Sequence, residues 1–137
     1  MAQTLDQQRA AYAWQAVKRA QQALPKFGDF KNLAKGAPAL IMGNGLMPSL
    51  AFYASRTSSN QKPAEALNKA IYEWLAQRFM TEAAFKPRPK NYADVMDDVM
   101  DRLLKAPAAF YMQATDEALA MLKWLRQFAA AIDQDGN

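Results

Sequence analysis

Apolar residues recur along this chain at intervals of three and four positions, the spacing that places them on one face of an α-helix. The longest such pattern covers roughly 108–133, and another covers 5–24. No stretch alternates between apolar and polar residues in the manner of a half-buried strand, and β-branched residues are few. We therefore predict an all-α fold.

Proline, glycine and polar loops divide the pattern into about six helices. Between the two long patterns we predict a helix from near Asp29 to the Gly43-Asn44-Gly45 stop, one with Pro48 in its first turn that ends near Arg56, one from Pro63 to Phe79, and one over about 93–105. Gly36 and Pro38 predict a kink in the second helix, or two short pieces. We expect residues 1–137 to form a single-domain helical bundle.

The 137 residues include no cysteine and no histidine. The lack of cysteine excludes disulfides, thiolate metal sites and cysteine nucleophiles. The lack of histidine removes the commonest general base and metal ligand, and with it every Ser-His or Cys-His pair. We therefore expect a binding and assembly protein with no catalytic residues, no cofactor, no metal and no small-molecule substrate.

No apolar run approaches the 18 or so residues that a membrane span needs. The N-terminal segment lacks the charged head and apolar stretch of a signal peptide. We expect a cytoplasmic protein without a membrane partner.

The net charge of +4 is distributed unevenly along the chain. Residues 1–90 carry 13 basic and 5 acidic side chains, for a net charge of +8, whereas residues 91–137 carry 4 basic and 8 acidic ones, for a net charge of −4. Such a split favours a polyanionic partner, head-to-tail self-association, or both. An ordinary solvated surface is the alternative.

Asp94, Asp97, Asp98 and Asp101 stand at i, i+3, i+4 and i+7, so one helical face carries four carboxylates. Water, a cation or a basic partner has to offset the repulsion between these carboxylates. A solvated face near a helix N-terminus is the simplest interpretation. A face that docks the basic end of another subunit is the second, and a magnesium or calcium site is the third.

The turn Gly43-Asn44-Gly45 is interpreted first as a structural helix stop, because glycine and asparagine tolerate the backbone conformations that helix ends need. Its backbone N–H groups could instead cradle a phosphate as a nest. Trp14, Trp74 and Trp124 fall within or beside apolar stripes, so we expect them in the core rather than stacked on bases.

Several of these segments together resemble one known family. Leu40–Phe52, LIMGNGLMPSLAF, is similar to the signature of the small subunit of type III-B (Cmr) CRISPR effector complexes. The helix from Arg9 to Ala20, the pair Trp74-Leu75, and Tyr111–Phe128 with its Tyr-x-x-Ala-Thr-x-Glu-Ala element also resemble that family. The proline-broken connection at residues 86–90 departs from it.

The resemblance implies a helical subunit without enzymatic activity. Copies of such a subunit stack as a minor filament beside the backbone and large Cas subunits, and their basic faces contact the backbone of the guide–target RNA duplex. A subunit that accepts any target should read phosphates and shape rather than base edges. By charge and position at helix flanks, we select as RNA contacts Lys18, Lys35, Arg56, Lys123 and Arg126.

Three alternatives stay open. The type III-A (Csm) small subunit has the same role, although the Asn44-Gly45-Leu46 segment argues against it. A helical adaptor or scaffold would bind only protein. A metal-dependent enzyme would use the Asp94–Asp101 face.

Overall fold

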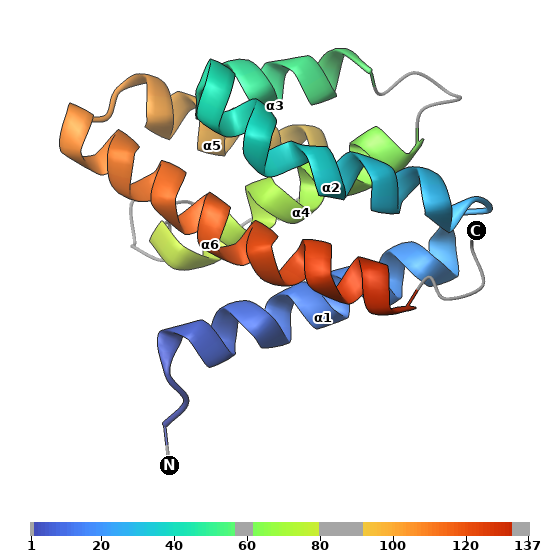
Figure 1. The fold of residues 1–137 in the computed structure, drawn as a ribbon. Coiled ribbons are helices and arrows are strands. Elements are labelled where there is room, and N and C mark those ends of the chain that lie inside the picture. Colours follow the sequence, from blue (N-terminus) through green and yellow to red (C-terminus); the bar gives the residue numbers. More distant parts are fainter. Residues whose placement is uncertain (1, 57–61, 80–91, 133–137) are drawn as a thin grey trace.

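The computed structural model describes residues 2–56, 62–79 and 92–132, and within them the chain is helical with short turns. The helices are α1 (Leu5–Ala23), α2 (Phe27–Asn44), α3 (Leu46–Ser55), α4 (Lys62–Phe79), α5 (Tyr92–Leu104) and α6 (Ala108–Ile132). The predicted all-α fold of about six helices is confirmed (Figure 1). The connection at residues 86–90 lies outside the described residues.

The ends of α1 follow from local chemistry. The Thr4 hydroxyl accepts a hydrogen bond from the Gln7 backbone, while the Gln7 side chain accepts one from the Thr4 backbone, which completes a capping box. At the other end, Leu24 has extended backbone angles (φ −99°, ψ 133°) because Pro25 follows it. Small residues on the buried face of α1, such as Ala13 and Ala16, let it lie close to α6.

One prediction for α2 was wrong, and one of two alternatives for it is excluded. The helix begins at Phe27 after Lys26, two residues before the expected cap at Asp29. It also runs as one helix through Gly36 and Pro38, which excludes the alternative of two short pieces, while the kink stays a prediction. Pro38 cannot donate the usual bond to the Ala34 carbonyl. Burial of this helix against α4 and α6, with Ile41 almost fully buried, outweighs that loss.

Helix α4 lies at the centre of the bundle, and α1, α2, α3, α5 and α6 all pack against it. Its residues Leu67, Ile71 and Leu75 are buried, and they join one core with residues from the other helices. Helices α2, α6 and α1 follow one another down the front of Figure 1, with α6 between its two neighbours. In the described part of the chain, no helix is long and apolar enough to cross a membrane.

Tryptophan burial matches the prediction only in part. Trp74 is buried, whereas Trp124 is partly buried and Trp14 is 40% exposed. The expectation of a core position was therefore wrong for Trp14. Its position beside an apolar stripe places it at the edge of the α1/α6 contact, where one side of the indole packs and the other meets solvent.

Candidate nucleic-acid interface

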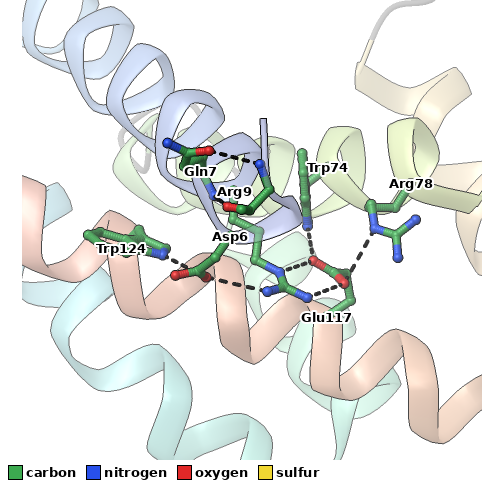
Figure 2. A network of polar contacts seen from close by, with 8 residues as sticks. Asp6, Gln7, Arg9, Trp74, Arg78, Glu117 and Trp124 are labelled. Atoms are coloured by element: carbon green, nitrogen blue, oxygen red, sulfur yellow. Dashed lines mark hydrogen bonds and ion pairs between the residues drawn. The ribbon is translucent and has the colours of Figure 1, made fainter. Parts of the chain in front are cut away.

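Glu117 of α6 is a buried carboxylate that joins three helices, as Figure 2 shows. Arg9 of α1 donates two hydrogen bonds to it, from Nε to Oε2 at 2.6 Å and from Nη2 to Oε1 at 3.0 Å. From α4, the Trp74 indole donates to Oε2 at 3.0 Å, and the Arg78 Nε lies 3.4 Å from Oε1. We call these four residues the Glu117 cluster.

The Glu117 cluster keeps its central carboxylate ionised. Burial alone would raise the pKa of Glu117, but hydrogen bonds from Arg9 and Trp74, with the charges of Arg9 and Arg78, lower that pKa below its ordinary value. The same hydrogen bonding raises the pKa of Arg9. Two cations around one buried carboxylate satisfy it, so the cluster binds α1, α4 and α6 together rather than awaiting a ligand.

Our sequence reasoning treated Glu117 only as one letter of a family element and missed this role. A signal was present, because Glu117 stands at helical spacing with the buried residues Ala114, Ala118 and Met121. An acidic residue inside an apolar stripe needs a buried cationic partner. The sequence alone does not indicate which arginine provides it.

The polar contacts continue from the Glu117 cluster to the start of α1. Arg9 also lies 3.3 Å from the Asp6 carboxylate, which accepts a hydrogen bond from the Trp124 indole at 3.1 Å (Figure 2). The Trp124 bond, assisted by Arg9 and Lys123, lowers the pKa of Asp6. The Asp6 carboxylate therefore stays ionised and pairs with Arg9, although its side chain is exposed.

The predicted turn at residues 43–45 contains a helix end and one special backbone conformation. Gly43 and Asn44 form the last turn of α2, and Gly45 has φ 95° and ψ 161°, a region that is essentially restricted to glycine. The Gly45 N–H donates to the Ile41 carbonyl at 2.7 Å, and the Met47 N–H donates to the Tyr111 hydroxyl at 3.0 Å. Because both N–H groups bond within the chain, the geometry does not offer them to a phosphate.

Three of the five predicted RNA contacts lie on α2 and α6. Lys35, Lys123 and Arg126 are all exposed. The Tyr111–Met47 bond joins the start of α6 to the start of α3, directly after the end of α2, and α2 and α6 pack as antiparallel neighbours (Figure 1). At about 1.5 Å per residue, Lys35 stands about 15 Å from Gly45 and Lys123 about 18 Å from Tyr111, so the two lysines lie at nearly the same level.

The inner side of helix α6 packs on α4, and α1 and α2 lie on either side of α6. The exposed residues Lys123 and Arg126 therefore occupy its outer strip, between those two neighbours. Lys18 of α1 is partly buried, with its ammonium 5.7 Å from the centre of a Trp14 ring. We call the side formed by Lys18, Lys35, Lys123 and Arg126 the basic face.

Arg56 does not belong to the basic face. It follows the end of α3, which packs against α4 and α2, and Figure 1 shows α3 at the opposite edge of the bundle from α1. Its guanidinium lies 5.4 Å from the centre of the half-exposed Phe52 ring. An RNA contact by Arg56 would thus use a different edge of the molecule.

The four aspartates lie on α5, whose residues Val95, Val99 and Leu103 are buried in the core. Asp101 pairs with Lys105 at 3.1 Å, and Asp97 is exposed. Among the described residues, no three carboxylates are close enough together to hold a metal ion. The spacing along the helix therefore does not converge on a cation site, and the geometry gives no support to the metal-dependent enzyme.

A shallow groove of about 540 Å³ runs between α1 and α4. Its lining includes Gln8, Gln15 and Gln77, one cation, Arg19, and one anion, Glu73. With one charge of each sign, the groove adds little to the positive potential of the basic face.

Comparison with known proteins agrees with this architecture. Residues 5–132 match the profile of a family described as CRISPR-associated protein (Cas_Cmr5). The chain is also similar to the crystal structure of a CRISPR-associated Cmr5 family protein from Thermus thermophilus, with a TM-score of 0.69 and 26% sequence identity. That similarity covers 95% of this chain and 97% of the other.

Proposed function

The chain belongs to the Cas_Cmr5 family of CRISPR-associated proteins, and from this premise we propose that it is the non-catalytic small subunit of a type III-B effector that binds the guide–target RNA duplex through its basic face. It acts in the cytoplasm, as one domain, with the backbone and large Cas subunits as partners. The family match confirms the type III-B resemblance and favours it over type III-A.

The observation that carries the RNA proposal is the position of Lys35, Lys123 and Arg126. All three are exposed on adjacent helices, and none of them is engaged by the Glu117 cluster. Cations spread along a surface suit a phosphate backbone, because they supply charge without reading bases. One copy should bind weakly, and repetition along a filament should raise the affinity.

The test is target-RNA binding by an effector reconstituted with the triple variant Lys35→Glu, Lys123→Glu, Arg126→Glu. We expect weaker binding, and the slope of log affinity against log salt should fall by up to about 1 for each phosphate that the variant no longer neutralises. Arg56→Glu is tested separately because it lies at another edge.

The matched control changes the charge equally elsewhere, with Lys62→Glu, Lys69→Glu and Lys105→Glu, whose side chains are 61%, 52% and 74% exposed. The proposal fails if both triple variants lower the affinity equally, or if neither does. If RNA binding by the effector does not depend on this chain, the result favours a protein-only adaptor.

The opposite charges of the chain support a second part of the proposal, the stacking of copies. Helix α5 carries the aspartates and packs mainly on α4, whereas the basic face belongs to α1, α2 and α6. An acidic side and a basic side on one molecule favour a head-to-tail contact that repeats without closing. The aspartates of one copy would then meet cations of the next copy that lie outside the basic face, which stays open to RNA.

Sedimentation of the purified chain at low and high salt tests this stacking. We expect self-association at low salt, dissociation at high salt, and loss of association in Asp97→Lys. Asp116→Lys is the control, because Asp116 is an exposed aspartate on α6 rather than α5. Association that is indifferent to salt would refute the electrostatic contact.

A further inference from the structure

Three aromatic rings form a row between α1 and α6, at the far end of that contact from Met112. The Phe128 ring lies 5.2 Å from Trp14 at an angle of 81°, and 5.6 Å from Trp124 at 27°. Phe128 thus supports both indoles from α6. Trp14 ends the row on α1, and 40% of its surface is exposed. We call Trp14, Trp124 and Phe128 the Trp14 platform.

Two lysines flank this platform. The Lys18 ammonium stands 5.7 Å from the centre of a Trp14 ring, and Lys123 is the exposed residue directly before Trp124. The neighbouring carboxylate, Asp6, is held by the Trp124 indole and by Arg9. An anion that approaches Trp14 therefore meets these two lysines, and the nearby Asp6 carboxylate is already paired with Arg9.

From this arrangement we infer that the exposed face of Trp14 stacks on an unpaired base of bound RNA, while Lys18 pairs with a phosphate beside that base. The inference rests on the proposed function and goes beyond it, since it adds a contact with RNA that is not paired in the duplex. Aromatic side chains stack on bases of any sequence, because every base has a π-face. Bases within a duplex are covered by their neighbours, so the ligand is an unpaired nucleotide.

A protein partner fits this site less well than a base does. The other large apolar side chains that the described residues expose are Met42 on α2, Phe52 on α3, Leu104 at the end of α5 and Met112 near the start of α6. Met112 is 16 residues before Phe128, or about 24 Å along the helix. Trp14 and its partly buried neighbours Phe128 and Trp124 therefore form a small apolar area among charged side chains, whereas protein interfaces have a larger contiguous core depleted in charge.

Lys18 does not block the stacking. A cation over an exposed indole is held more weakly than a stacked base, and the lysine stem is flexible. When a base covers the ring, the ammonium can exchange that contact for a charge-assisted bond to phosphate. The cation and the ring thus act on adjacent parts of one nucleotide.

The test compares two fluorescently labelled RNAs with the full chain at low salt, by anisotropy. One is a 12-residue oligoadenylate, and the other is the same sugar–phosphate chain without bases. We expect Trp14→Ala to weaken binding of oligoadenylate by about tenfold, within the range of one base–aromatic stack, and to leave the abasic chain unchanged. Trp14→Phe should retain most of the affinity.

Phe52→Ala provides the matched control, because Phe52 is 45% exposed and also lies beneath a cation, Arg56, but on α3. It should leave both affinities unchanged. Stacking is refuted if Trp14→Ala weakens both RNAs equally or neither, or if Phe52→Ala has the same effect as Trp14→Ala. Wild-type chain that binds neither RNA, or that binds both with equal affinity, refutes the stacking alone, because the proposed function concerns the duplex bound by the assembled effector and is tested there with the triple variant.

Discussion

The Glu117 cluster and the Trp14 platform both lie at the contact between α1 and α6, yet they use similar side chains in opposite ways. In the cluster, Arg9, Arg78 and Trp74 all turn toward one buried carboxylate. In the platform, an indole and the Lys18 cation stand at the surface. The first arrangement is satisfied within the chain, and the second leaves a ring face and a charge for a partner.

This difference separates the residues that hold the helices together from those that we assign to RNA. Arg9, Trp74, Tyr111 and Glu117 belong to the segments that carry the resemblance, and each forms a contact between helices. The cations of the basic face lie outside such contacts. The segments that carry the resemblance contain both kinds of residue, since Lys18, Lys123 and Arg126 also lie in them. The RNA surface therefore has to be found from exposure and charge.

The largest expected effect is on the Glu117 cluster. Glu117→Ala leaves Arg9, Arg78 and the Trp74 indole without their common acceptor, so the free energy of unfolding should fall by about 3 kcal/mol, the low end for a broken buried pair because both arginines stay partly exposed. Urea denaturation measures this change. Asp116→Ala, at the exposed neighbouring position, should stay within about 0.5 kcal/mol of wild type. Equal losses in the two variants would contradict a structural role for the cluster.

The next effect concerns Gly45. Gly45→Ala forces a side chain into a backbone conformation that only glycine adopts readily, at a cost of about 1–3 kcal/mol, while the added Cβ meets Pro48 and Tyr111 at ordinary contact distances. Gly43→Ala is the control. It lies within α2 with nothing near the added carbon, and should stabilise the protein by about 0.5–1 kcal/mol. Thermal unfolding should shift in opposite directions; a shift in the same direction would contradict the assigned backbone role.

Tyr111→Phe is expected to have a smaller effect. It removes the hydroxyl that accepts from the Met47 N–H while it keeps the ring, so stability should fall by about 1 kcal/mol. Chemical denaturation of Tyr111→Phe against wild type measures the loss. An unchanged stability would show that the Met47 N–H finds another acceptor.

At acid pH, the free energy of unfolding should depend on pH more steeply in wild type than in Glu117→Gln, because of the Glu117 cluster. The pKa of Glu117 is lower in the folded protein than its ordinary value of 4.5, so its contribution is complete above that value. The contribution is lost as the pH falls through the folded-state pKa. Glu117→Gln should therefore lose less stability than wild type below pH 4.5, and identical slopes would contradict an ionised, paired carboxylate.

Sequence patterning predicted the helices because apolar spacing and proline positions are local properties. It failed at the start of α2, which lies two residues before Asp29, and at Trp14, because position beside a stripe does not reveal how far a neighbour covers it. The partner of Glu117 could not be predicted either, since Arg9 is 108 residues away. The basic face is a prediction from charge whose geometry comes from the packing of α1, α2 and α6.

The most direct test of this separation is lysine acetylation footprinting of the reconstituted effector, with and without bound target RNA, followed by mass spectrometry. The proposal predicts that RNA protects Lys18, Lys35 and Lys123, and leaves Lys62, Lys69 and Lys105 as reactive as before. Protection of the second group, or no change at the first, would contradict the assignment of RNA binding to the basic face.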